Sequence, residues 1–480
     1  MGRIWCHSSS MSSPCSARIQ PSSRSAGHAL ATACAVLALA AGQGAAAQAS
    51  PSVKGADEAR TGGPITATGW WIGRIDPVAQ MLIERTLISN PSLEQAAARI
   101  DEAAAALGAA RADGRPTADG SFSATQENSD DGSEARVLDG GLDLNWTVDL
   151  FGRVAAGSAA ARARLSARTA DAALMRLALT TQIADAALQL QACRVSEANL
   201  AVEIESRRAT LDLTRLRREA GLTAPIDEAR AATGLAAART SLVLRRQDCD
   251  RLGNVLANLA GMGRLEVDRL IGAPSRLPTP WIASTRLPAD LLVDHLAVSA
   301  ARQDAEAAIA DVKAARAERM PRLDLAAVLS GRWFDASGSA LDVIASAFGP
   351  ALSIPFLDGG RGTADVQGAE ARYRGMSAGV ELAIRRAAQD IDDAIAAADS
   401  ARARELTSAD ALDASAFVLR AVEAQWRSGA VSQFELEDAR RQYNAAQESA
   451  VAARRDRGQA SIALVLALGG ATPATEESDT

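Results

Sequence analysis

The chain has 480 residues, of which 48% are hydrophobic but only 3% are aromatic. It is long enough to bury a sizeable core, yet it lacks the rings that fill most globular cores, and alanine takes their place. The 51 basic and 58 acidic residues give a net charge of -7 without a dense basic stripe, so nucleic acid is not expected as a partner.

Residues 1–49 have the pattern of a signal peptide for export. Arg18 and Arg24 precede the apolar run ALATACAVLALAAG, and AAAQAS then offers a cleavage site near Ala47 or Ala49. Cys34 raises the alternative of a lipid anchor, but ATAC lacks a leucine three residues before the cysteine. No later stretch of 18 apolar residues appears, so we expect no transmembrane helix in the mature chain.

An internal repeat organises the rest of the chain. AARADGRP, which ends at Pro116, returns as AARAERMP, which ends at Pro321, and Gly221 and Gly261 return as Gly429 and Gly469. Two copies of one unit are therefore fused head to tail. The predicted organisation is an N-terminal extended segment at 50–75, a first repeat at 76–263, a linker at 264–288, a second repeat at 289–470 and a disordered acidic tail at 471–480.

Strands are expected in both repeats, because apolar and polar residues alternate there. The segment GGLDLNWTVDLFGR shows this alternation in the first repeat, and the second repeat contains a similar alternation. Such a sheet either covers a soluble core or spans a membrane as a β-barrel with lipid outside and water inside. The duplication favours the barrel, with Trp146 and Trp333 as aromatics at the membrane interfaces. The four strands are expected at 117–126, 138–148, 322–334 and 348–356.

Four strands cannot close a barrel, and open sheet edges are not tolerated in lipid. The chain must therefore assemble with further copies if these strands span a membrane. Three copies would supply a barrel of twelve strands.

Two very long helices are expected at 153–219 and 361–427. Both stretches lack proline, and in the first the apolar residues recur at alternating steps of three and four, as in a coiled-coil seam. At 1.5 Å per residue each helix would be about 100 Å long. In each repeat, the two shorter helices together have about as many residues as the long helix, so they can lie end to end beside it. Strands and long helices together make the fold class α+β, and the helical hairpins turn at EAGLTAP and RSGAVSQ.

Two cysteines remain after the export signal. Cys193 lies 28 residues before Gly221 and Cys249 lies 28 residues after it, so a hairpin that turns at this glycine brings them level. An oxidising compartment permits a disulfide between them, provided that both face the same side of the hairpin. Two buried free thiols are the alternative.

Enzymatic chemistry finds little support. The mature chain has one histidine, His295, which we expect in a helix, and no GxSxG, HExxH or CxxC motif, so we expect no catalytic residues, metal or cofactor. DGGRG at 358–362 lacks the Lys-Ser/Thr of a phosphate-binding loop, and a tight turn from strand to helix explains it better.

NWTVDLFGR, LSIPFLDGGR, the duplication and the glycine-containing helix turns resemble the TolC-type outer membrane factor family, in particular its NodT-like branch of efflux channels. The resemblance covers Asp76 to Gly470. It implies a homotrimer in outer membrane lipid, with a twelve-stranded barrel that continues into a coiled-coil periplasmic tunnel. It also implies docking through a periplasmic adaptor (membrane fusion) protein to an inner membrane pump.

The resemblance also implies site residues near the helix turns. Acidic positions of the family's periplasmic gate fall on Glu435 and Asp438, with Asp227 in the first repeat, and a gate tyrosine position falls on Trp426. Three copies of Glu435 and Asp438 near a threefold axis would favour cation entry; solvated surface carboxylates are the alternative for both. The implied adaptor-docking residues, of which the glycines would also cap helices, are Arg218, Gly221, Leu222, Thr223, Gly429, Ala430, Val431 and Ser432.

These observations predict the outer membrane channel component of a tripartite efflux system of the RND type, which conducts small molecules. A type I protein secretion duct is an alternative within the same class. A periplasmic coiled-coil adaptor or scaffold is an alternative of another class, but it would need no duplicated pair of strands with a lipid-compatible face. No Walker motif is present, so the energy for transport would come from the pump.

Overall fold

The computed structural model describes residues 69–72, 75–128, 134–272, 277, 295–336 and 339–470, all within one compact unit inside Val53–Thr480. The expected export signal at 1–49 and the acidic tail at 471–480 lie outside the described residues. So do most of the segment at 50–75 and the later part of the linker.

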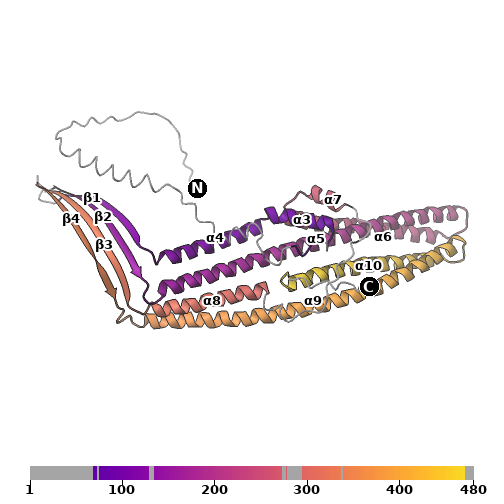
Figure 1. The fold of residues 1–480 in the computed structure, drawn as a ribbon. Helices are drawn as coiled ribbons and strands as arrows, with labels where there is room; N and C mark the ends of the chain where they lie inside the picture. Colours follow the sequence, from indigo (N-terminus) through magenta and orange to yellow (C-terminus); the bar gives the residue numbers. More distant parts are fainter. Residues whose placement is uncertain are drawn as a thin grey trace, which may run out of the picture. The chain divides into compact units, whose positions relative to one another are not determined.

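The described elements follow the same order twice: short helices, two strands, a very long helix and a returning helix (Figure 1). In chain order they are α3 (Pro77–Ser89), α4 (Pro91–Ala112), β1 (Thr117–Asn128), β2 (Glu134–Val148), α5 (Arg153–Glu219), α6 (Pro225–Ala260), α7 (Arg264–Ile271), α8 (Leu296–Ala317), β3 (Arg322–Ala336), β4 (Ser339–Ser353), α9 (Arg361–Arg427) and α10 (Gln433–Ala467).

The four strands form one antiparallel sheet in the order β1-β2-β3-β4. Within the described part of this sheet, β1 and β4 each have one neighbour and form its two edges. Strands from the two halves of the chain therefore meet in the middle, where Leu142 pairs with Leu329.

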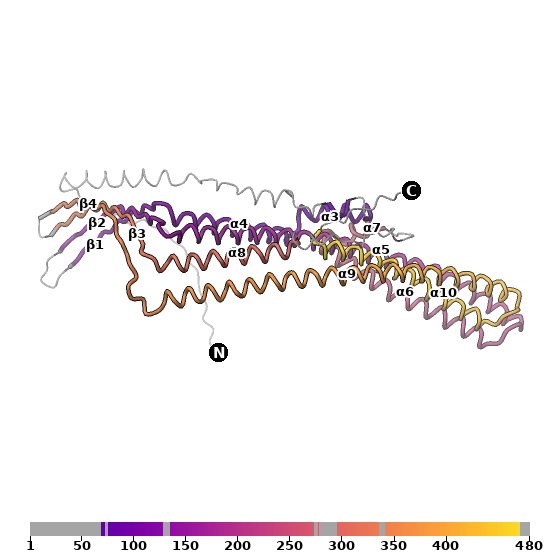
Figure 2. Tube along the Cα trace, turned by 60° about the horizontal axis from the view of Figure 1, so that its bottom comes forward, coloured from indigo at the N-terminus to yellow at the C-terminus, as the bar shows by residue number. Residues whose placement is uncertain are grey.

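The long helices α5 and α9 hold the rest of the structure together. Near the sheet, α4, α5, α8 and α9 pack side by side in this order (Figure 2). Near the helix turns the order of contacting helices is α6, α5, α10 and α9. The main hydrophobic core lies between these two levels. There α3, α6, α7 and α10 surround α5, with Leu82, Leu190, Leu256, Val267 and Val465 among the buried side chains.

The two long helices differ in how much of their surface the chain itself covers. Both have 67 residues, but α5 has 24 buried residues and α9 only 8. Four of the eight, Ala387, Ala394, Ala401 and Ser408, recur every seven residues, as in a narrow coiled-coil seam. The remaining circumference of α9 is without a neighbour among the described residues.

Several boundaries differ from those expected. Strand β4 runs over Ser339–Ser353 rather than 348–356, because its first half pairs fully with β3 although it is rich in small residues. Helix α7 lies inside the expected linker, and α8 begins at Leu296. Among the described helices, none is long and apolar enough to cross a membrane.

Candidate functional site

One face of the sheet is apolar and exposed. Leu138 pairs with Trp333 and Trp146 pairs with Leu325, so both tryptophans lie on the same face as Leu142 and Leu329. Residues that pair directly across strands share a face, which extends this surface onto β1 and β4. Its exposed large side chains are Phe122, Leu142, Leu144, Trp146, Leu329, Ile344, Phe348 and Leu352.

The opposite face is mostly polar and small. Arg332 donates to Asp139 at 2.6 Å, and the Thr147 hydroxyl donates to Asp324 at 2.6 Å, each across the β2–β3 pair. Asp119 and Asp143 stand directly opposite each other in the register of β1 and β2. Apolar residues occur on this face mainly toward the turns between paired strands, where Phe334 pairs with Leu341.

At the other end of the long helices, α5 and α9 stop in the same way. Gly221 and Gly429 have φ angles of 72° and 81°, in the left-handed region that favours glycine. The backbone N–H of the residue after each glycine donates to a carbonyl in the last turn of the helix. Leu222 donates to the Arg217 carbonyl and Ala430 to the Gln425 carbonyl, each at 2.8 Å. These bonds are those of a Schellman cap, so the glycines have a structural role in both turns.

The expected docking residues surround these turns. Of the eight, Thr223 and Val431 are half-buried and the others are exposed. Leu222 is 77% exposed, and Ile226 and Phe434, which the sequence analysis did not single out, add exposed apolar side chains on the first turns of α6 and α10. Apolar side chains are thus exposed at both described helix turns.

The three acidic residues that the sequence analysis expects at the gate lie on the first two turns of α6 and α10, and each has a local partner. Asp227 accepts a hydrogen bond from the Thr223 hydroxyl at 2.7 Å. Glu435 forms a capping box with Ser432, whose backbone N–H donates to the Glu435 carboxylate at 3.1 Å. Asp438 forms an ion pair with Arg441. Each carboxylate therefore has a structural use that does not depend on a second copy.

Trp426 joins the two turns. It is 7% exposed, and the Arg217 guanidinium carbon lies 4.6 Å from the centre of its ring. Arg217 also donates to the backbone carbonyls of Trp426 and Arg427, at 3.4 and 3.2 Å. A cation over an aromatic face is favourable, more so when water is excluded. Trp426, which the sequence analysis expects at a gate position, is thus held by contacts within the same chain.

A buried group of charges further along these helices was missed by sequence reasoning. Arg207 on α5 forms an ion pair with Glu437 on α10, and Arg440 on α10 donates to the Thr210 hydroxyl on α5 at 2.7 Å. Arg207 and Arg440 are 8% and 7% exposed. An isolated buried charge is costly, so losing these contacts would destabilise the packing of the hairpin α5–α6 against the hairpin α9–α10.

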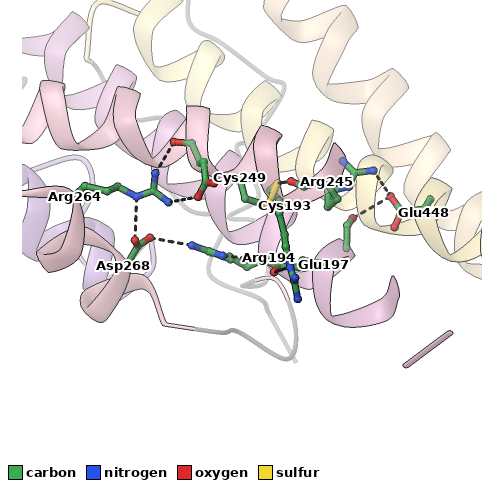
Figure 3. The surroundings of a disulfide bond; sticks show 11 residues. Cys193, Arg194, Glu197, Arg245, Cys249, Arg264, Asp268 and Glu448 are labelled. Carbon is green, nitrogen blue, oxygen red and sulfur yellow. Dashed lines mark hydrogen bonds and ion pairs between the residues drawn. A yellow bond between two sulfur atoms is a disulfide. The ribbon is translucent and has the colours of Figure 1, made fainter. Parts of the chain in front are cut away.

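Cys193 and Cys249 form a disulfide between α5 and α6, with 5.5 Å between their Cα atoms (Figure 3). The two cysteines therefore lie level across the hairpin, as their equal distance in sequence from Gly221 predicts. Next to it, the Glu448 carboxylate on α10 accepts from the Ser196 hydroxyl and from Arg245, each at 3.0 Å. Three helices are thus tied together at this level.

On the other side of the disulfide, Arg194 of α5 and Arg264 of α7 connect α7 to its neighbours (Figure 3). Arg194 donates to Asp268 at 2.9 Å, and Arg264 donates to Asp268 at 3.1 Å and to Asp250 at 2.9 Å. Gly253 leaves room for the Arg264 guanidinium, since a Cβ there would lie 2.5 Å from it. The short helix α7 is therefore fixed against α5 and α6 by charge as well as by packing.

His295 lies at the N-terminal cap of α8 and is buried. Burial lowers the pKa of its imidazole, and a hydrogen bond to the Ala467 backbone and the charge of Asp390 oppose this only in part. Asp358 accepts from the N–H groups of Gly360 and Gly362, each at 2.8 Å, which lowers its pKa and stabilises the start of α9. The DGGRG segment is thus a strand-to-helix turn. No group of three or more potential metal ligands is found among the described residues.

The family model for outer membrane efflux protein matches residues 82–262 and again residues 287–470. These two matches cover more than half of the chain. The chain belongs to the outer membrane efflux protein family.

Named relatives match nearly the whole chain. Nodulation protein T of Rhizobium leguminosarum bv. viciae is 26% identical over 420 residues, which is 86% of either chain. Outer membrane protein OprJ of Pseudomonas aeruginosa is 28% identical over 442 residues, or 88% of this chain and 91% of OprJ. The protein is therefore an outer membrane efflux component, and the alternative of a periplasmic adaptor or scaffold is not supported.

Solved structures agree on the fold. The outer membrane protein VceC of Vibrio cholerae has a TM-score of 0.73 at 25% identity, with 83% of this chain and 98% of VceC covered. CusC has a TM-score of 0.74 at 22% identity, with 84% and 94% covered. The fold is thus that of the outer membrane channels, which combine a helical tunnel with a β-barrel and are not enzymes.

Proposed function

We propose that three copies of this chain form an outer membrane channel, in which twelve strands close a barrel and twelve helices continue it as a periplasmic tunnel. The channel is the outermost part of a tripartite efflux assembly of the RND type. The observation that carries the proposal is the open four-stranded sheet with one exposed apolar face. Two features of the chain, at its sheet and at its long helices, indicate how the copies meet.

The first feature is the pair of sheet edges. β1 and β4 would each present unpaired N–H and C=O groups, which hydrocarbon does not tolerate. Pairing β4 of one copy with β1 of the next satisfies both edges, and three such pairings close a ring of twelve strands. The apolar face then contacts lipid, and the polar face with Asp139 and Arg332 lines the aqueous interior.

The second feature is the uncovered surface of α9. In the packing order of the helices, α9 lies at one edge along its whole length, and α4 and α6 lie at the other edge. Placing α9 of one copy against α4 and α6 of the next would continue both layers. Exposed apolar residues are available on both sides of such a contact: Leu406, Phe417 and Val418 on α9, and Val243 and Leu244 on α6.

The helix turns are the proposed entrance of the tunnel. Leu222, Ile226 and Phe434 would contact a periplasmic adaptor protein, which connects the channel to an inner membrane pump. Glu435 and Asp438, with Asp227 beside them, would form the acidic constriction. A narrow ring of carboxylates favours cations over anions, so this chain would supply a charge filter rather than energy for transport.

The cargo is proposed only as small molecules. Relatives carry names that refer to different exports: CusC of Escherichia coli is a cation efflux system protein, and OpmQ of Pseudomonas aeruginosa is a pyoverdine export protein. Because such different names occur at similar identity, we assign the choice of cargo to the pump. A duct for protein secretion of type I would use the same conduit with another partner.

Photo-crosslinking in cells tests the assembly. A photoreactive amino acid replaces Leu222 or Phe434 at the turns, and Val255, which is exposed toward the opposite end of α6, serves as the control. We expect the two turn positions, but not Val255, to crosslink to an adaptor of an RND-type pump, identified by mass spectrometry. Crosslinks to the adaptor of a secretion ATPase would support the type I duct, and the absence of any adaptor crosslink at the turns would overturn the proposed docking.

A further inference from the structure

The disulfide between Cys193 and Cys249 lies inside the main hydrophobic core. Cys249 is 0% exposed and Cys193 is 5% exposed, and both belong to the cluster that contains Leu190, Val267 and Val465. A thiol is oxidised by exchange only when a sulfur of the oxidant can reach it, and buried cysteines are inert. The packing of the folded chain therefore keeps an oxidant away from these two sulfur atoms.

Two helices outside the hairpin α5–α6 cover the disulfide, one on each side (Figure 3). Helix α7 is held there by Asp268, which accepts a hydrogen bond from Arg194. Helix α10 is held by Glu448, which accepts from Ser196 and Arg245. These three hairpin residues each lie within about one helical turn of a cysteine, so α7 and α10 meet the hairpin at the level of the bond.

Both covering helices follow the hairpin in the chain. Helix α6 ends at Ala260, whereas α7 begins at Arg264 and α10 at Gln433. The N-terminal part of a chain is the first to become available for folding, so the whole hairpin can pair before α10 is present. At that stage the equal spacing of the cysteines about Gly221 already places them level. The side of the hairpin that α10 later covers is then open to an oxidant.

Arg245 has a different environment before and after α10 packs. In the folded chain its guanidinium forms an ion pair with the Glu448 carboxylate at 3.0 Å, and it has no second acidic partner among the described residues. Before α10 arrives this guanidinium is unpaired, four residues before Cys249 and on the same face of α6. A nearby positive charge favours the thiolate, which is the reactive form of cysteine. The hairpin alone therefore holds a more reactive pair of thiols than the folded chain.

We propose that the hairpin α5–α6 is a substrate of a thiol oxidase of the periplasm, and that its disulfide closes before α7 and α10 pack over it. One cysteine thiolate attacks the disulfide of the oxidase, forms a mixed disulfide and displaces one oxidase sulfur as a thiolate. The thiolate of the other cysteine attacks the hairpin sulfur of this mixed disulfide and closes the bond between Cys193 and Cys249. The oxidase leaves as a dithiol, with the two electrons and the two protons that the cysteines give up.

Oxidation of the reduced chain tests the order of the two events. Full-length protein is produced in a host that lacks the oxidase, folded in detergent with its thiols reduced, and exposed to oxidised glutathione. Alkylation with a maleimide that shifts the band on a gel follows the loss of free thiols. We expect this loss to be on the order of 100-fold slower in the folded chain than in denaturant, because a buried thiol reacts only when the structure opens locally. Equal rates in the two states would overturn the proposed order.

A relocated pair of cysteines serves as the control for accessibility. Leu200→Cys/Leu242→Cys is made in a chain whose native cysteines are changed to alanine. These positions lie one heptad nearer the turn, on the same sides of α5 and α6, and are half-buried. In the folded chain this pair should react much faster than the native pair. If both pairs react equally slowly, burial of the native cysteines does not cause the difference.

A second pair of variants tests the role of α10. Glu448→Arg places a like charge opposite Arg245 and should accelerate the reaction of the native thiols in the folded chain by about tenfold, because the local opening that exposes them becomes easier. Asp456→Arg is the matched control. Asp456 also lies on α10, and its side chain is 33% exposed against 36% for Glu448, but it pairs with Arg404 on α9. Equal rates in the two variants would contradict the role of α10 as the cover.

Trapping of the mixed disulfide in cells tests the partner and needs no folded, reduced protein. Full-length chain with Cys249→Ala has no second thiol to close the bond, so its mixed disulfide with the oxidase should persist after acid quenching. We expect a reductant-sensitive complex that mass spectrometry identifies as the oxidase, and none with Cys193→Ala/Cys249→Ala. A wild-type chain that is oxidised equally fast in hosts with and without the oxidase would overturn the partner. None of these readouts uses the trimer, so a failure of the proposed channel assembly would leave them unchanged.

Discussion

Trp146 and Trp333 lie on one face of the sheet, at opposite ends of its apolar surface. Trp333 pairs with Leu138, which is on the same strand as Trp146 and eight residues before it. At roughly 3.3 Å per residue this separation is about 26 Å along the strand. The apolar band of a membrane barrel is about 25 Å tall and is bordered by aromatic residues at both interfaces. The two tryptophans thus mark the proposed width of the hydrocarbon layer.

Leu142 lies midway between these two ends, so a charge there should be the most costly. We predict that Leu142→Arg destabilises the assembled protein by about 2–4 kcal/mol, because arginine at the centre of the bilayer must face lipid. Ser330→Arg is the control, since Ser330 pairs with Gly141 on the opposite face. Folding titrations in lipid vesicles measure both. An equal loss in the two variants would contradict the assignment of faces.

The disulfide should stabilise the first hairpin. It spans 56 residues of sequence, and the chain-entropy relation gives about 4 kcal/mol for a loop of this size. We predict that Cys193→Ala/Cys249→Ala lowers the thermal midpoint and that reductant lowers it in the wild type but not in this variant. Thermal unfolding with and without dithiothreitol checks both statements. Two titratable thiols in the oxidised wild-type protein would show that the bond does not form.

Glu435 can be tested for two roles separately. Glutamine keeps the capping box with Ser432 but removes the charge, whereas alanine removes both. We predict that Glu435→Gln retains helix stability and weakens the cation preference of the channel. Glu435→Ala should also cost about 0.5–1 kcal/mol, because the Ser432 N–H loses its side-chain acceptor. Reversal potentials in planar bilayers and thermal unfolding are the two measurements. If the cation preference is unchanged in both variants, Glu435 is a cap and not part of a charge filter.

His295 should make stability depend on pH. Burial lowers its pKa in the folded chain, so the unfolded chain binds the proton more tightly. Stability attributable to this group is then present above the unfolded pKa of about 6.5 and is lost as the pH falls below it. We predict that His295→Gln loses less stability than the wild type between neutral pH and about pH 5. Identical losses would mean that other groups cause the dependence.

Local patterns in the sequence predict a large part of this structure. The alternation around Leu142 and Trp146 predicts the apolar face, and the spacing of Cys193 and Cys249 about Gly221 predicts that they lie level. The first half of β4 was missed, because Ser339 to Ala347 contain many small residues and show a weak apolar period. The start of β4 is determined by its pairing with β3, and a local sequence pattern does not predict such pairing.

The buried group of charges around Arg207 and Glu437 could not be predicted in the same way. Arg207 and Glu437 are 230 residues apart, and their contact depends on which turn of α5 faces which turn of α10. In the sequence they are two charges among many on helices rich in charge. Gly234 is a partial signal, since a glycine within a helix costs about 1 kcal/mol relative to alanine and therefore indicates a close approach.

The most direct test of the account is the size of the protein in the outer membrane. The outer membrane fraction is run on a denaturing gel with and without heating, and the protein is detected by blotting. The account predicts a band in the unheated sample at about three times the mass of the mature chain, which collapses to the monomer on heating. A monomer in both lanes, recovered from the soluble periplasm, would contradict it.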